Sequence, residues 1–304
     1  MKDLGLVAGS DTAGPREGLA TWCGLAACAA LALLIRGYGF GQEDQFLYLP
    51  FLYQWETPSL FPGDPLLTLG LSKLSATWPL AYLLSRLLGW GPAFFLLHLA
   101  ATLLSLAAVR RITAAVWPSR TSAWMCVLLW LPAYDVPGVG IATFDTYFTA
   151  RCAGWAVGLW ALALFLERRR VWAAALLAAG VFLHVASVLP LAGGMWVVLL
   201  ARRRWRDAGV FAAVLGAACA GLALYGRAVG FSTDPFERFD TELFPSLVRF
   251  LPDVFPAGWP PSAWFAMGVV LAAALLAGLA YVGGPLRSGP GTELAGVTAG
   301  AVLL

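Results

Sequence analysis

Long apolar runs, interrupted by short polar segments, make up most of the chain. About 20 apolar residues cross the hydrocarbon core of a bilayer as a helix, so each run near this length predicts a membrane span. The predicted spans are residues 18–36, 92–109, 117–134, 147–166, 171–188, 189–201, 208–228 and 262–283. A ninth apolar segment begins at residue 294 and stops at Leu304, which is consistent with a piece of a longer protein. The pattern predicts an all-α, polytopic integral membrane protein with about eight to nine transmembrane helices.

The composition excludes a soluble globular protein. Apolar residues make up 60% of the 304 positions, charged residues make up 12%, and the mean hydropathy is +0.76, far from soluble averages. The five cysteines lie inside apolar runs and lack the spacing of a metal site or a disulfide framework. The first run follows a leader of mixed charge, so we interpret it as an uncleaved span and not as a signal peptide. We expect residues 1–304 to form a single transmembrane domain.

Arginine clusters predict the orientation of the spans. The clusters are Arg110 and Arg111 with Arg120, residues 168–170, and residues 202–206. Cytoplasmic loops carry an excess of basic residues, and all three clusters alternate correctly if the short apolar segment 75–90 does not cross the membrane. We therefore expect a cytoplasmic N-terminus and a segment 75–90 that lies on the membrane surface as an amphipathic helix.

Under this topology three external loops hold most of the candidate chemistry. They are residues 37–91, 135–147 and 229–261. Loops of this length in a compact domain are usually functional. The first opens with Glu43 and Asp44, followed by Gln45 and Tyr48, a combination of hydrogen-bonding groups and aromatic faces that suits sugar rings. The alternative is an aromatic belt at the membrane surface with two solvated charges beside it.

Further candidates lie near the outer ends of other spans. Arg151 is about one turn inside the fourth predicted span, where a charge is costly unless it is paired or meets a phosphate group. Asp145 is a possible partner, although a spacing of six does not place two residues on one helix face; snorkelling of Arg151 to the lipid headgroups is a third possibility. His184 lies near the outer end of the fifth predicted span, and Arg238 lies in the third loop. A lone helical histidine is more often a packed residue than a catalyst.

The layout resembles the GT-C glycosyltransferases, polytopic enzymes that use polyprenyl-phosphate-linked sugars. The resemblance covers most of the chain as topology. As specific residues it covers QED at 42–44, the span FTARCAGWAVGLWALALFLERRR and the segment VFLHVASVLP that contains His184. A second acidic pair in the first loop and the large C-terminal external domain of many members are missing.

The resemblance implies an inverting transfer of a sugar from a polyprenyl-phosphate donor to an acceptor hydroxyl at the external or periplasmic face of the inner (plasma) membrane. Asp44 is then the expected general base, with Glu43 in reserve. Arg151, with Arg238, would stabilise the departing phosphate. The other expected substrate-binding residues are Asp145, His184, Gln45 and Tyr48. A divalent metal, Mg or Mn, is compatible with the acidic residues, and the acceptor would be a glycan, a lipid or a protein, not a nucleic acid.

Two other hypotheses remain. A transporter or flippase for a lipid-linked or small polar substrate would also use a polar outer cavity with Arg and His; it predicts ionisable residues near the centres of several spans, whereas here they gather at outer ends. A non-catalytic membrane subunit would use the same residues only to bind partners.

Overall fold

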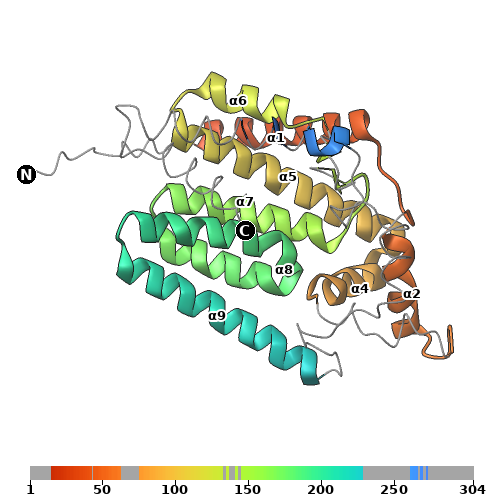
Figure 1. Cartoon of the computed structure of the whole chain (residues 1–304). Helices are drawn as coiled ribbons and strands as arrows, with labels where there is room; N and C mark the ends of the chain where they lie inside the picture. Colours follow the sequence, from red (N-terminus) through yellow and green to blue (C-terminus); the bar gives the residue numbers. More distant parts are fainter. Residues whose placement is uncertain are drawn as a thin grey trace, which may run out of the picture.

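The structure is a computed structural model, and it describes residues 15–42, 44–62, 75–132, 135–136, 141–142, 145–228, 261–265, 268–269 and 272. Apart from one two-residue pairing of strands, the described part of the chain is helical (Figure 1). The elements in chain order are α1 (Pro15–Arg36), α2 (Gln45–Glu56), α4 (Thr77–Leu88), α5 (Trp90–Val116), α6 (Arg120–Leu129), β1 (Asp135–Val136), β2 (Ile141–Ala142), α7 (Ala150–Leu166), α8 (Arg170–Ala201) and α9 (Trp205–Ala228). The prediction of an all-α fold is confirmed at this level.

Four helices are long and apolar enough to cross a membrane. They are Gly18–Arg36 of α1, then α5, α8 and α9, with mean hydropathies of 2.0 to 2.1. The chain is therefore a membrane protein by length and composition of its helices. α6 has 10 residues and α7 has 17, so both are shorter than the spans predicted there. Most of segment 262–283, the segment from 294 and the loop 229–260 lie outside the described residues, and the number of crossings stays a prediction.

α8 folds back on itself at His184. This residue has extended backbone angles, φ −159° and ψ 95°, between two helical arms. A Cβ placed on Gly180 would lie 2.8 Å from a methyl carbon of Val188, and the Arg170 guanidinium lies 2.7 Å from the Asp207 carboxylate. A straight helix of this length would separate its ends by about 48 Å, so both contacts require antiparallel arms (Figure 1). The two arms correspond to the predicted segments 171–188 and 189–201, with the turn about five residues earlier.

α7 is the element around which the others pack. Phe165 belongs to a cluster with α8 and α9, Leu159 to one with α1, α5 and α6, and the residues before and at the start of α7 to one with α2, α4 and α5. Two glycines let α8 approach closely, because a Cβ on Gly154 would lie 2.8 Å from the His184 Cβ, and one on Gly158 would lie 2.8 Å from a Leu191 methyl carbon. Small residues at such contacts are the usual basis of helix association in membranes. The N-terminus of α7 is thereby held from three sides.

A helix, α4, is present within the predicted segment 75–90, and its position on the membrane surface stays a prediction. Trp78 and Ala81 are buried against the protein, while Leu80, Leu83 and Leu87 point outward and are 52 to 76% exposed. Its N-terminal end is tied to the first arm of α8, because the backbone N–H of Ala76 donates to the Phe182 carbonyl at 2.8 Å and the Ser75 hydroxyl donates to the Leu183 carbonyl at 2.5 Å. The last carbonyls of a helix arm have no hydrogen-bond partner within the arm. The donors at the start of α4 bind these carbonyls and fix α4 beside the turn at His184.

Candidate functional site

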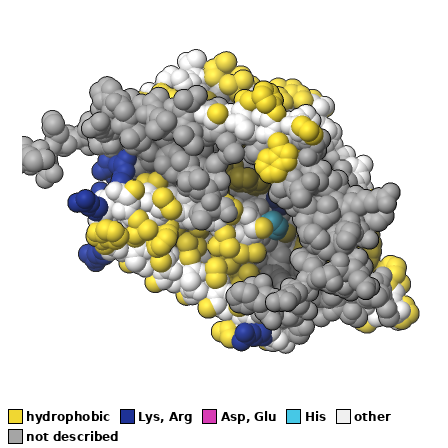
Figure 2. Space-filling model, in the orientation of Figure 1, with side chains coloured by type: hydrophobic (Ala, Val, Ile, Leu, Met, Phe, Trp, Pro, Cys, Tyr) yellow, Lys and Arg dark blue, Asp and Glu magenta, His cyan; other side chains and the backbone are white. Residues whose placement is uncertain are grey.

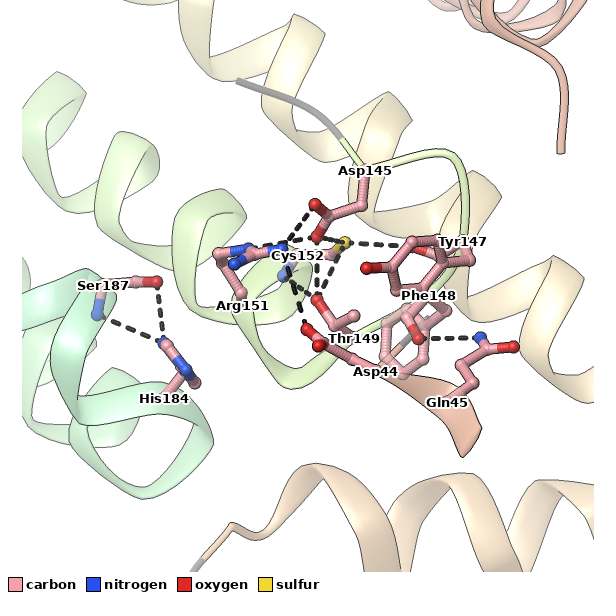
Figure 3. Close-up of polar contacts among 10 residues, drawn as sticks. All are labelled: Asp44, Gln45, Asp145, Tyr147, Phe148, Thr149, Arg151, Cys152, His184 and Ser187. Carbon is pink, nitrogen blue, oxygen red and sulfur yellow. Dashed lines mark hydrogen bonds and ion pairs between the residues drawn. The ribbon is translucent and has the colours of Figure 1, made fainter. Parts of the chain in front are cut away.

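Several of the predicted site residues lie together where the loop before α7, the start of α2 and the turn of α8 meet (Figure 3). Asp44, Asp145, Arg151 and His184 all lie there. Their segments are far apart in the sequence but adjacent to the N-terminal end of α7. The site is at the opposite end of α7 from the arginine-rich turn at residues 167–170.

The start of α7 has the features of a capped helix N-terminus. Thr149 is the N-cap residue, with extended backbone angles and a side chain that accepts from the backbone N–H of Cys152 at 3.4 Å. The same hydroxyl donates to the Asp145 carboxylate at 3.0 Å. Because the first N–H groups of a helix carry partial positive charge, they favour a carboxylate at this position. The cap thus fixes both the helix start and the loop that carries Asp145.

Asp145 and Arg151 form a bidentate ion pair. The distances from the Arg151 Nη2 and Nε atoms to the two Asp145 oxygens are 2.6 and 3.1 Å, and the Asp145 side chain is only 6% exposed. The Cys152 thiol also points at the same carboxylate at 3.5 Å. Asp145 lies in the loop before α7 and not on the helix, so the spacing of six is no obstacle to pairing. The spacing argument based on one helix face did not predict this contact. The ion pair with Asp145 neutralises the charge of Arg151.

Asp44 is the accessible carboxylate of the site. It lies 3.9 Å from Arg151 Nη2, and its side chain is 44% exposed. The Asp145 carboxylate accepts from guanidinium, hydroxyl and thiol donors and is 6% exposed, whereas the Asp44 carboxylate lies farther from the guanidinium and is more accessible. Of the two carboxylates, Asp44 is therefore the one that can accept a proton from an incoming group.

His184 and Arg151 line a cavity of about 350 Å³, together with Trp155, Ala186, Ser187, Pro190 and Leu191. The backbone N–H of Ser187 donates to His184 Nδ1 at 3.2 Å, and the Ser187 hydroxyl lies 2.8 Å from the same atom. Since Nδ1 accepts from a backbone N–H, the neutral ring carries its proton on Nε2. Figure 2 shows a histidine side chain in a hollow of this face, with hydrophobic side chains around it. The cavity combines a cation and a neutral donor with apolar and aromatic walls.

Gln45 and Tyr48 make structural contacts within the protein and do not line this cavity. Gln45 is fully buried, donates to the Phe148 carbonyl at 2.9 Å and accepts from the Gly41 N–H at 2.6 Å. Tyr48 stacks on Trp78 with ring centroids 4.4 Å apart. Burial raises the pKa of Tyr48, Asp44 raises it further, and Arg151 opposes both, which places the phenol near the two charges. Glu43 and Arg238 lie outside the described residues.

Sequence reasoning missed Thr149, Cys152, Trp155 and Ser187. Thr149 had a usable signal, because threonine directly before an apolar helical run is a preferred N-cap. Ser187 lies three residues after His184, but the turn that brings the two side chains together has no marker in the hydropathy pattern.

The described residues do not form a metal site. No group of three His, Cys, Asp or Glu side chains gathers among them. The position between Asp44 and Asp145, where a divalent ion would bridge two carboxylates, is occupied by the Arg151 guanidinium. These residues as arranged therefore do not fit the Mg or Mn ion with which the acidic residues of the sequence are compatible.

The chain matches no known family model, and neither a curated protein nor a solved structure is similar enough to count as a match. The candidate site therefore stands on its own geometry.

Proposed function

We propose that the chain is a GT-C-type membrane glycosyltransferase that transfers a sugar from a polyprenyl-phosphate donor to an acceptor hydroxyl, with inversion. The observation that carries the proposal is the convergence of Arg151 and His184 at one cavity with apolar walls, with the Asp44 carboxylate 3.9 Å from Arg151. Such a cavity suits a ligand with a phosphate head and a hydrocarbon tail. Membrane proteins place ionisable groups at this depth mainly for function.

The chemistry follows from the roles that the side chains can take. The Asp44 carboxylate accepts the proton of the acceptor hydroxyl, whose oxygen attacks the anomeric carbon from the face opposite the phosphate. The new glycosidic C–O bond forms as the bond from the anomeric carbon to the phosphate oxygen breaks. The bonding electrons leave with the polyprenyl phosphate, whose negative charge is stabilised by Arg151 and by the Nε2–H of His184.

The geometry favours Asp44 over Asp145 as the base. A base must be within reach of the acceptor hydroxyl. Asp145 is 6% exposed and Asp44 is 44% exposed. Asp145 then acts as a positioning residue that holds Arg151.

The proposal includes eight to nine crossings, a cytoplasmic N-terminus and an external or periplasmic site in the inner membrane. The arginine-rich turns lie at the opposite end of α7 and of the α8 arms from the candidate site. The positive-inside rule favours cytoplasmic turns, and this supports an external position for the cavity.

The test is turnover of a defined donor panel by the purified full chain in proteoliposomes. Polyprenyl-phosphate hexoses and pentoses are supplied with cell-envelope extract as acceptor, and released polyprenyl phosphate is measured by mass spectrometry. We expect one donor to be consumed by the wild type and none by Asp44→Asn with an unchanged melting temperature. Glu56→Gln is the matched control, because Glu56 is also on α2 but pairs with Arg86 at 3.2 Å away from the cavity.

Three results would overturn parts of the proposal. Full turnover by Asp44→Asn would remove Asp44 as the base. Flux of an intact lipid-linked sugar across the bilayer without polyprenyl phosphate release would identify a flippase. Unchanged cellular function after simultaneous replacement of Asp44 and Arg151 would identify a non-catalytic subunit.

A further inference from the structure

Two tight turns at the end of the bundle opposite the candidate site carry seven arginines. We name residues 167–170 and 202–207 the arginine end; the two segments read ERRR and RRRWRD. Its two acidic residues are already engaged, because Glu167 is bound by Arg111, and Asp207 by Arg170 at 2.7 Å and Arg204 at 3.5 Å. Figure 2 shows Lys and Arg side chains at the edge of the molecule where α8 ends and α9 begins in Figure 1. The arginine end therefore keeps a strong positive charge.

Both turns place an arginine where glycine is the usual residue. Arg168 and Arg203 have φ of 64° and 55°. In the first turn the Arg169 N–H donates to the Leu164 carbonyl at 2.9 Å and the Arg168 N–H to the Phe165 carbonyl at 2.9 Å. The second turn repeats the pattern from residues 203 and 204 to residues 200 and 199. This is the Schellman ending of a helix, in which the left-handed position favours glycine.

A chain with 33 glycines thus uses arginine twice at a position that glycine fits better. Backbone strain kept at a defined position is an indication of function. The positive-inside rule alone asks for basic residues somewhere in these loops. The positive-inside rule does not explain why basic residues occupy the two left-handed positions. We infer that the positive charge has a role at these positions.

A cavity of about 200 Å³ opens between the start of α8 and the start of α9. Its rim carries Arg170, Arg206 and Asp207, and its walls include Val171, Val210 and Phe211. A second cavity of about 310 Å³ shares Arg206 and Asp207 and adds Arg203, Arg204 and Trp205. Trp205 and Trp172 are 65 and 62% exposed, as tryptophans at the level of the headgroups often are. The first cavity thus combines charged residues with apolar walls, and the second has further arginines beside it.

We propose that the arginine end binds the phosphate headgroup of an anionic phospholipid. The phosphate is held by Arg206 and Arg203, and the first part of an acyl chain lies along Val210 and Phe211. Among the described residues neither Arg206 nor Arg203 has a carboxylate within 4.0 Å. Basic pockets between membrane helices are the usual headgroup sites, and the apolar wall and exposed tryptophans favour a lipid over a free anion. The proposal does not depend on the glycosyltransferase function.

The test is native mass spectrometry of the delipidated full chain in neutral detergent, titrated with phosphatidylglycerol, phosphatidylcholine or inorganic phosphate. We expect one phosphatidylglycerol to bind in preference to phosphatidylcholine. Each of Arg206→Gln and Arg203→Gly should weaken it about fivefold, the effect of about one charge near a headgroup. The control Arg120→Gln removes an exposed arginine of α6 that lines neither cavity and should leave the affinity unchanged.

Arg203→Gly separates a structural role from a binding role. Glycine should raise the melting temperature because it relieves the left-handed position, so a loss of lipid in this variant cannot come from misfolding. Retained affinity in Arg203→Gly and Arg206→Gln, equal binding of phosphatidylcholine, or an equal loss in Arg120→Gln would each overturn the proposal. Displacement of phosphatidylglycerol by millimolar inorganic phosphate would overturn the lipid assignment and leave a site for small anions.

Discussion

The ion pair between Asp145 and Arg151 makes a quantitative prediction for Asp145→Asn. The substitution removes the carboxylate that accepts two guanidinium hydrogen bonds and the Thr149 hydroxyl. Arg151 remains only 21% exposed, with Asp44 at 3.9 Å as its remaining anion. Breaking one side of a buried pair typically costs about 3–5 kcal/mol because the other charge is left without compensation. Since Asp44 still offsets part of that charge, we expect a loss of about 3 kcal/mol.

The assay is equilibrium unfolding of the full chain in detergent micelles, followed by tryptophan fluorescence. Asp44→Asn is the comparison, and it should cost less than about 1 kcal/mol because pairs this exposed contribute little. The double variant with Arg151→Gln should recover about 2 kcal/mol relative to additivity, since it also removes the stranded cation. A cost for Asp145→Asn as small as that for Asp44→Asn, or strict additivity, would refute the claim that Asp145 holds Arg151.

Three further predictions concern packing and ionisation. Gly154→Ala should lower the free energy of unfolding by about 1–3 kcal/mol, because its Cβ would lie 2.8 Å from the His184 Cβ. The control Gly216→Ala, whose Cβ would meet nothing within 4 Å, should raise the free energy of unfolding by about 0.4–1 kcal/mol. Chemical denaturation measures both changes. Gln45→Leu should cost about 1–3 kcal/mol in the same assay, because the Phe148 carbonyl and the Gly41 N–H lose their buried partner. Burial raises the pKa of Tyr38 to about 12, so the folded state keeps the phenol proton while the unfolded chain ionises near pH 10. The free energy of unfolding should therefore fall as the pH rises from about 10 to 12. Tyr38→Phe should make this fall smaller. Absorbance at alkaline pH would follow the phenol directly.

The apolar pattern predicted most helices because length and polarity alone decide which segments can cross a membrane. α1, α5 and α9 agree with their predicted spans within a few residues at most boundaries. The sequence prediction placed the turn in α8 too late in the chain. Residues 171–200 are almost uniformly apolar, and a hydropathy pattern does not show where an apolar segment reverses direction. The break is at His184, where Gly154 of α7 lets the turn approach closely.

The candidate site was predictable by residue type but not by contact. Asp44 and Arg151 were chosen as charges near one face of the membrane, and the structure brings them to 3.9 Å across 107 positions of sequence. Gln45 was chosen as a hydrogen-bonding group that suits a sugar ring, yet it is fully buried and hydrogen-bonded to the backbone. The polarity of a residue in the sequence does not distinguish a side chain that binds a ligand from one that hydrogen-bonds the backbone of a loop. That distinction depends on which backbone groups the fold leaves without partners.

The balance of charge in the site leads to one more prediction, on ligand affinity. Two carboxylates face one guanidinium, so an incoming phosphate competes with them for its positive charge. Asp44 is the weaker partner, at 3.9 Å against 2.6 Å for Asp145, and it would yield first. A donor phosphate would then release Asp44 to face the acceptor, which couples donor binding to the appearance of the base.

Under this mechanism Asp44→Asn should bind polyprenyl phosphate more tightly than the wild type while losing turnover. Removing an exposed competing charge changes the free energy by up to about 1 kcal/mol, which corresponds to a gain of up to about fivefold in affinity. Titration calorimetry with polyprenyl phosphate measures it, and Glu56→Gln should show no gain. Weaker binding by Asp44→Asn would mean that Asp44 contacts the ligand itself, through a hydroxyl or a bound cation, and that Arg151 does not exchange its partners.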